Sequence, residues 1–232
     1  MASADELKLL SYGLTLGIDQ QINKNWLFGL ALGENKTSVK FAQTSDKDTI
    51  NAFHTNVFAR RTFDQFFLDV EGNFGYNDHA FQHNATQWSV SGEAGTWWCH
   101  GLGRVEPYVR LSHVCWSGAS NLYDRNDTKE TLMAGVRYSW RTATDLTTTV
   151  PRFYGGVLQE LGNKSLFQVS SFGNTPTVFP IHNLEVSSTR LFLGGGFTTS
   201  MGTSLDIFLR YTAELSSRDT SHTALLGVNC CF

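Results

Sequence analysis

The chain ends on the stretch SHTALLGVNCCF (Ser221–Phe232), in which every second residue from Ala224 onward is apolar or cysteine. Successive side chains of a β-strand point to opposite faces of the sheet, so this pattern predicts a strand with one apolar face. A terminal aromatic residue such as Phe232 is typical of the strand that closes a membrane β-barrel, because aromatic residues line the membrane interfaces of such barrels.

Ten earlier segments alternate in the same way, and we expect each of them to be a strand. In the clearest one, apolar residues from Phe66 to Tyr76 oppose Asp69, Glu71 and Asn73. The ten segments are residues 10–19, 26–33, 51–62, 66–77, 88–98, 105–112, 132–141, 149–161, 190–197 and 205–215.

The lengths of these strands and of their connections favour a membrane barrel over a soluble sandwich. Strands of about ten residues are what a tilted strand needs to cross a bilayer, whereas soluble strands average about five or six. Short turns alternate with longer polar loops, expected near 43–48, 77–86 and 117–129, as in outer-membrane barrels. The segment 162–187 has room for a small hairpin.

Composition agrees with an all-β barrel that has a mixed interior. Aromatic residues make up 13% of the 232 residues, glycine is frequent at 21 and proline is rare at 4. The formal net charge of −3 gives no basic face for nucleic acid. No run of about 18 apolar residues predicts a transmembrane helix, but alternating barrel strands score weakly on hydropathy.

We therefore predict an antiparallel up-and-down transmembrane β-barrel, with one domain over residues 1–232. Eleven strands are visible, and bacterial single-chain barrels carry an even number, so we expect a first strand upstream and about twelve in total. Residues 1–6 show no signal peptide, so we expect a piece of a longer protein or a removed leader.

Several stretches resemble the β-domain of bacterial autotransporters, the translocators of type V secretion. Tyr12–Asp19 resembles the family's G-x-x-x-G-x-D strand, and Val105–Leu111 resembles its mid-barrel Pro-Tyr strand. Tyr154–Glu160, with its acidic end, and the last two strands with Phe232 also match the family pattern. The order and spacing of these pieces carry the resemblance, which extends over nearly the whole chain.

The resemblance implies an outer-membrane barrel that anchors and helps to export an N-terminal passenger of the same chain. It implies that the barrel-assembly machinery recognises Phe232 as an assembly signal. The passenger and the linker helix of the family have no counterpart in this sequence. The alternatives that stay open are an outer-membrane porin or adhesion barrel, and a soluble carbohydrate-binding β-sandwich.

The polar faces of the strands supply the candidate functional residues. Charged residues on neighbouring strands are expected to form a cross-strand ladder in the lumen: Arg110, Arg137, Glu160, Arg190, Asp206 and Arg210. Such a ladder either keeps the interior wet and fixes the strand register, or holds a linker helix and sets ion selectivity. Four tryptophans are expected as membrane-interface anchors: Trp26, Trp88, Trp98 and Trp140.

Enzymatic and metal-dependent functions find little support. Ser112 and His113 are adjacent in a strand, so they face opposite ways and form no nucleophile–base pair. No G-x-S-x-G motif occurs. Cys99, Cys115, Cys230 and Cys231 lack the C-x-x-C spacing of metal sites, so we expect unpaired cysteines, no metal and no cofactor.

Overall fold

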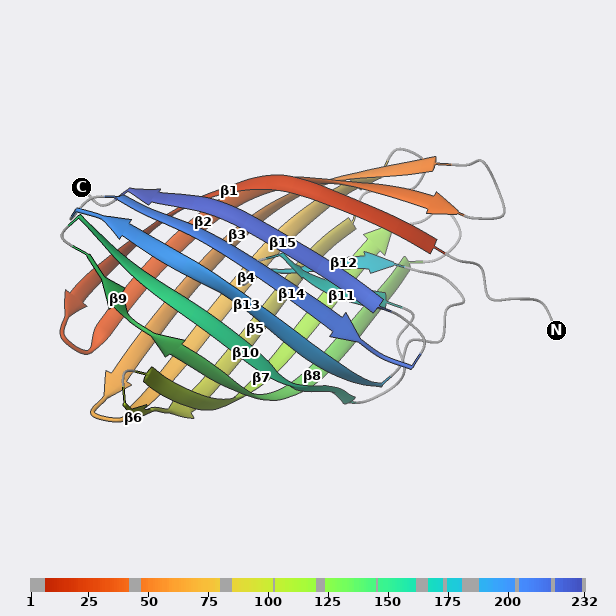
Figure 1. Ribbon diagram of the computed structural model, residues 1–232. Helices are drawn as coiled ribbons and strands as arrows, with labels where there is room; N and C mark the ends of the chain where they lie inside the picture. Colours follow the sequence, from red (N-terminus) through yellow and green to blue (C-terminus); the bar gives the residue numbers. More distant parts are fainter. Residues whose placement is uncertain are drawn as a thin grey trace.

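Eleven long antiparallel strands follow one another in chain order and form one curled sheet (Figure 1). The computed structural model describes residues 7–41, 47–79, 85–101, 103–119, 124–144, 146–161, 167–172, 175–180, 188–202, 205–217 and 220–230. The strands are β1 (Leu7–Asn23), β2 (Trp26–Phe41), β3 (Lys47–Phe63), β4 (Phe66–His79), β5 (Ala85–Thr96), β7 (Gly103–Ala119), β8 (Asp124–Trp140), β10 (Thr147–Leu161), β13 (Thr189–Met201), β14 (Leu205–Leu215) and β15 (Thr220–Cys230).

Four shorter strands complete the described structure. β6 (Trp98–His100) pairs with β7, and β9 (Thr142–Ala143) pairs with β10. β11 (Phe167–Phe172) and β12 (Thr175–Pro180) form a separate hairpin, as predicted for the segment between β10 and β13. All eleven predicted strands are therefore confirmed.

The strands are longer than predicted, and they extend into two of the expected loops. β4 extends to His79 and β5 begins at Ala85, inside the loop expected at 77–86. β7 and β8 stay paired up to Ala119 and Asp124, inside the loop expected at 117–129. Strands that project beyond a bilayer are wetted on both faces, so they keep their backbone hydrogen bonds but lose the alternation on which the sequence prediction depended.

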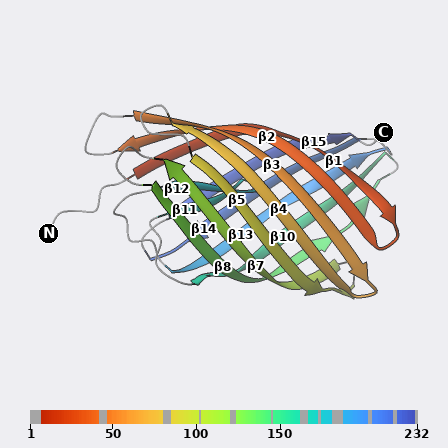
Figure 2. The ribbon, with the colours of Figure 1, turned by 180° about the vertical axis from the view of Figure 1, so that it is seen from behind.

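The polarity of the two faces of the sheet is the reverse of that in a soluble protein. Apolar residues on the convex outer face are exposed, with Ile18 at 76% and Leu226 at 71%, whereas the polar Glu93 and Asn77 on the inner face are 2% and 1% exposed. Among the residues that the structure describes, no second sheet covers the outer face, which excludes the soluble β-sandwich (Figure 2). Among the described residues there is no helical segment with the length and hydropathy of a membrane span.

Tight turns join the strands at one end of the sheet, the end at which β15 finishes in Figure 1. Lys24-Asn25 joins β1 to β2, and the Asn23 side-chain carbonyl accepts hydrogen bonds from the amides of Asn25 (2.9 Å) and Trp26 (3.0 Å). Asp64 turns β3 into β4 with a φ of 36°, a left-handed conformation that aspartate tolerates better than most residues. We call this end the turn end and the opposite one the loop end.

Inside the sheet, aromatic rings lie directly on glycines. Tyr154 on β10 crosses Gly194 on β13 and reaches β14, where its hydroxyl is 2.5 Å from the Thr212 hydroxyl. A Cβ atom at Gly194 would lie 2.3 Å from the Tyr154 ring. Gly194 therefore leaves the space inside the wall that the Tyr154 ring occupies.

We predict that Gly194→Val lowers the stability of the folded barrel by about 1–3 kcal/mol, because the new side chain displaces the Tyr154 ring. Gly92→Val is the matched control, since no atom lies within 4 Å of a Cβ at Gly92. The readout is the temperature at which the folded band converts to the unfolded band on a detergent gel. Equal shifts in the two variants would contradict the assignment.

Candidate functional site

The alternation of β3 to β14 directs one charged face into the interior, where the strands enclose a cavity of about 460 Å³. Eight basic and six acidic side chains line this lumen, which leaves a formal surplus of two positive charges. The charged residues are Arg60, Asp69, Glu71, Glu93, Arg104, Glu106, Arg110, Lys129, Arg137, Arg152, Glu160, Arg190, Arg210 and Glu214. They gather into separate clusters.

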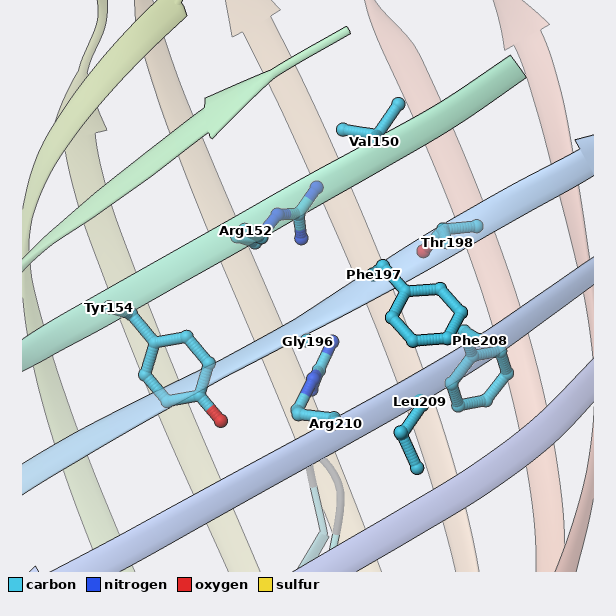
Figure 3. Close-up of a pocket in the computed structure, with 9 residues that line it drawn as sticks. All are labelled: Val150, Arg152, Tyr154, Gly196, Phe197, Thr198, Phe208, Leu209 and Arg210. Atoms are coloured by element: carbon cyan, nitrogen blue, oxygen red, sulfur yellow. The ribbon is translucent and has the colours of Figure 1, made fainter. Parts of the chain in front are cut away.

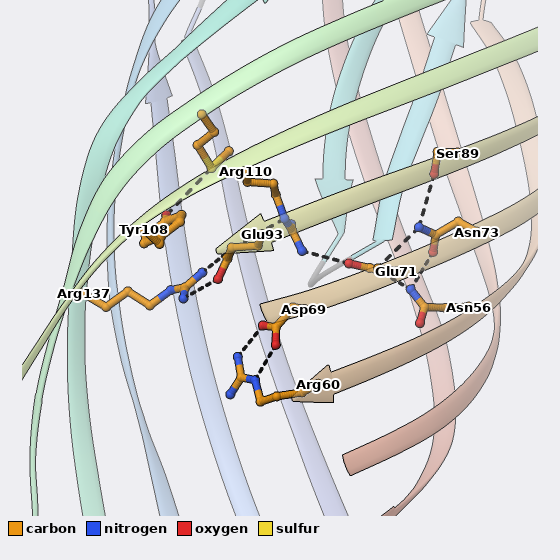
Figure 4. A network of polar contacts seen from close by, with 11 residues as sticks. Asn56, Arg60, Asp69, Glu71, Asn73, Ser89, Glu93, Tyr108, Arg110 and Arg137 are labelled. Atoms are coloured by element: carbon orange, nitrogen blue, oxygen red, sulfur yellow. Dashed lines mark hydrogen bonds and ion pairs between the residues drawn. The ribbon is translucent and has the colours of Figure 1, made fainter. Parts of the chain in front are cut away.

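The first cluster is centred on Glu93, whose side chain is 2% exposed (Figure 4). Both Arg137 terminal nitrogens donate to its carboxylate, at 2.6 and 2.7 Å. Arg110 lies between Glu93, at 3.5 Å, and Glu71, to which it donates at 2.9 Å. These ion pairs join β4, β5, β7 and β8 across the lumen wall, and paired, hydrogen-bonded charges of this kind are the form in which buried charges are tolerated.

Amides and a hydroxyl extend this cluster toward β3. Asn56 donates to Glu71 and, at 2.6 Å, to the Asn73 carbonyl oxygen. Asn73 in turn donates to the Ser89 hydroxyl at 3.2 Å. On the other side, the Arg137 guanidinium lies 3.7 Å from the centre of the Tyr108 ring. The network therefore fixes the relative positions of five consecutive long strands, β3 to β8.

The second cluster links the loop-end halves of β8, β10, β13 and β14. Glu160 accepts ion pairs from Lys129 and, at 3.4 Å, from Arg190. Arg190 also lies 3.5 Å from the Glu214 carboxylate. The Lys129 and Arg190 side chains are 6% and 3% exposed, so both charges depend on these partners.

A basic pocket of about 170 Å³ lies over β10, β13 and β14, nearer the turn end of these strands than the second cluster (Figure 3). Arg152 and Arg210 flank Gly196 in the strand register, one on each neighbouring strand. No carboxylate in the described ranges lies within ion-pairing distance of Arg152. This wall accounts for the positive surplus of the lumen, which suits anionic or carboxylate-bearing groups.

Five of the six residues of the predicted ladder line the lumen, but they do not form one ladder. Arg137 pairs with Glu93 instead of Glu160, and Glu160 belongs to the second cluster. Asp206 is not among the residues that line the cavity. A ladder requires each charge to meet its immediate neighbour, whereas arginine side chains reach past one strand to a carboxylate on the next.

The sequence prediction missed Glu71, Glu93 and Lys129 as partners. Glu93 lies directly opposite Arg110 in the β5–β7 register, so a correct register would have paired them. Lys129 fell in an expected loop, but it lies in β8. Register, not residue type, was the missing information.

The four predicted anchor tryptophans lie near the ends of strands on the outer face. Trp26, Trp98 and Trp140 lie at the turn end, and Trp88 lies near the loop end of β5. The Trp140 ring stacks on Phe153, with ring centroids 5.8 Å apart, and lies tilted against Tyr138 at 5.6 Å. Phe232 lies outside the described residues, so its role as an assembly signal stays a prediction.

No arrangement for acyl transfer or metal binding is present in the described part of the chain. Ser112 lines the lumen, whereas His113 faces outward, 5.2 Å from the Trp88 ring and 3.4 Å from Glu130. Cys99 and Cys115 are free thiols. No group of three or more metal-ligating side chains occurs within the residues described above.

We predict that Glu93→Gln destabilises the barrel by about 3 kcal/mol, because it leaves Arg137 and Arg110 without their shared carboxylate. Glu106→Gln is the control. Its partner Arg104 is 43% exposed, so its loss costs less than about 1 kcal/mol. Urea unfolding of the refolded protein in detergent, followed by tryptophan fluorescence, measures both values, and a Glu93 variant as stable as the control would refute the central role of this carboxylate.

Comparison with known proteins gives these features a context. The autotransporter β-domain family matches residues 2–212. The extracellular serine protease of Serratia marcescens is 22% identical over 245 residues, which cover 94% of this chain and 23% of the relative. The chain therefore spans about a quarter of the length of that protein.

Three solved structures share the fold. The β domain of the Bordetella autotransporter BrkA superposes with a TM-score of 0.75 at 17% identity, over 97% of this chain and 92% of that one. The translocator domain of NalP from Neisseria meningitidis gives 0.72 at 16% identity, over 97% and 82% of the two chains. The transport unit of AIDA-I from Escherichia coli gives 0.67 at 10% identity, over 98% and 84%. Because the family match covers most of its length, this chain belongs to the autotransporter β-domain family, whose members are barrels of the bacterial outer membrane.

Proposed function

We propose that this chain is the translocator of a longer protein, which it anchors in the outer membrane and whose N-terminal passenger it helps to bring to the cell surface. The observation that carries the proposal is the reversed distribution of side chains, with exposed apolar residues outside and a charged lumen inside, in a chain of the autotransporter β-domain family. A wet, charged lumen accommodates a polar polypeptide, whereas an apolar core does not. In this proposal the domain itself is not an enzyme.

The charge clusters and the basic wall support two different roles in the proposed translocator. The Glu93 and Glu160 clusters pair basic with acidic side chains on β4, β5, β7, β8, β10, β13 and β14, and we propose that they hold these strands together. The wall with Arg152 and Arg210 keeps its positive character. We therefore assign the first two clusters to wall stability, and the basic wall to contact with whatever passes through the lumen.

The edges of the sheet support the expected twelfth strand. No pairing joins β1 to β15 within the described ranges. In an antiparallel sheet of eleven strands the first and last run in the same direction, so they cannot form an antiparallel pair with each other. One further strand that is antiparallel to both would close the wall, and we propose that the longer protein supplies it upstream of this domain together with the linker helix and the passenger.

Two partners belong to this proposal in addition to the lipid bilayer. One is the passenger of the same chain, and the other is the barrel-assembly machinery, which we propose to read the terminal Phe232. A porin or adhesion barrel is the competing function, and it predicts no dependence of an upstream segment on this domain.

The proposal is tested with the full-length protein carrying an epitope upstream of this domain, expressed in a Gram-negative host. We expect antibodies to label the epitope on intact cells, and we expect deletion of this domain to abolish the labelling. Labelling that persists without the domain, or an epitope that stays inside the cell when the barrel is folded in the outer membrane, would refute it.

The basic wall is expected to affect the ion selectivity of the pore. We predict that Arg152→Gln together with Arg210→Gln reduces the preference of the pore for anions, because the double change removes the formal surplus of two positive charges. Reversal potentials in planar bilayers under a salt gradient measure the preference. Glu106→Gln with Arg104→Gln is a neutral-sum control, and a reversal potential unchanged in the first double variant would show that these arginines do not face the conducting path.

A further inference from the structure

Two consecutive arginines at the end of β3 face opposite sides of the wall. Arg60 points into the lumen, where its Nε and a terminal nitrogen donate to the two Asp69 carboxylate oxygens at 2.7 and 2.5 Å. Arg61 is exposed on the outer face, opposite Trp26 of β2 and Leu68 of β4 in the strand register. Among the described residues, the Arg60 guanidinium therefore has a carboxylate partner on the lumen side, whereas the Arg61 guanidinium has none on the outer side.

Aromatic rings take the place of a carboxylate at Arg61. Its guanidinium carbon lies 4.3 Å from the centre of the Phe63 ring and 5.2 Å from that of Trp26. No carboxylate of the described chain lies within 4.0 Å of it. Rings bind the flat faces of a guanidinium, so they hold the group in place while its N–H edges stay open to an acceptor.

The position of Arg61 along the barrel axis indicates where that acceptor comes from. Trp26 is the first residue of β2 and Phe63 the last of β3, so both rings lie at the turn end. Exposed Phe66 and Trp98 belong to the same end, and toward the middle of the strands the outer face carries Leu30, Val57 and Val70. Aromatic residues at the boundary of an apolar band mark the headgroup level of a bilayer.

We propose that Arg61, Trp26 and Phe63 form a binding site for the phosphate of a phospholipid headgroup at the turn end of the barrel. A guanidinium fork matches a phosphate with two parallel charge-assisted hydrogen bonds, and the acyl chains of the same lipid lie along the apolar band. The proposal rests on the membrane position of the family's β-domains, and it is independent of passenger export.

The test is native mass spectrometry of the full-length protein released from detergent micelles, with titrated phosphatidylglycerol. We compare the wild type with Arg61→Gln and Arg141→Gln. Arg141 lies at the same end of the barrel but on the lumen side, as its alternation with Arg137 shows, and its side chain donates to Thr148 at 3.5 Å. The Arg141 variant therefore removes an arginine from the turn end without changing the lipid face. We expect Arg61→Gln to bind its first lipid about tenfold more weakly, in line with the loss of a charged hydrogen bond, and Arg141→Gln to match the wild type.

Further arms separate the possible acceptors. Excess inorganic phosphate is expected not to displace the lipid, and a phosphate-free galactolipid of equal chain length is expected to bind all variants equally. Full displacement by inorganic phosphate would overturn the lipid assignment in favour of a free anion, and equal lipid binding by Arg61→Gln and the wild type would overturn the site.

If Arg61→Gln does not show the heat-modifiable folded band, Arg61→Lys replaces it, because lysine keeps the positive charge but has no guanidinium fork. We expect Arg61→Lys to bind the first lipid with an affinity between those of the wild type and Arg61→Gln. Wild-type affinity would count against the bidentate site.

Discussion

The structure depends on one constraint: inside a bilayer no water is present to hydrogen-bond the backbone, so every strand must be paired on both sides. Of the eleven long strands, the nine from β2 to β14 satisfy this constraint, because each is paired with a long strand on either side. Once the strands are paired, their side chains point alternately to the two faces of the sheet. Lipid contacts one face and the lumen the other, which explains why Ile18 is exposed while Glu93 is buried.

The interior solves the problem of placing many charges in a narrow space by local neutralisation. Glu93 and Glu160 each meet two basic groups that lie on different strands. The Arg137–Glu93 and Arg110–Glu71 pairs also join strands that are not hydrogen-bonded to each other. Aromatic rings on glycines, such as Tyr154 on Gly194, add apolar contact at the same wall without filling the lumen. The interior is therefore polar and still closely packed against its wall.

The sequence alone was enough to place the eleven strands and to assign their two faces. The alternation of apolar and polar residues can be read along each strand without knowing which strand pairs with it. It was not enough for the ion pairs. Arg137 and Glu93 are separated by β7, and only the stagger of three strands brings them together. The ends of the strands could not be predicted either. Lys129 lies in a stretch of β8 that is polar on both faces, and the sequence of such a stretch does not show whether its backbone is paired.

The common direction of β1 and β15 has a consequence for how the protein is threaded. Both strands run from the loop end to the turn end, so a strand that fills the seam between them and precedes β1 begins at the turn end. Short turns mark the periplasmic side of such barrels, so the residues before that strand start at the periplasmic mouth. Under the proposed function, an upstream segment bound for the outside would pass through the lumen, whose lining includes Arg152 and Arg210.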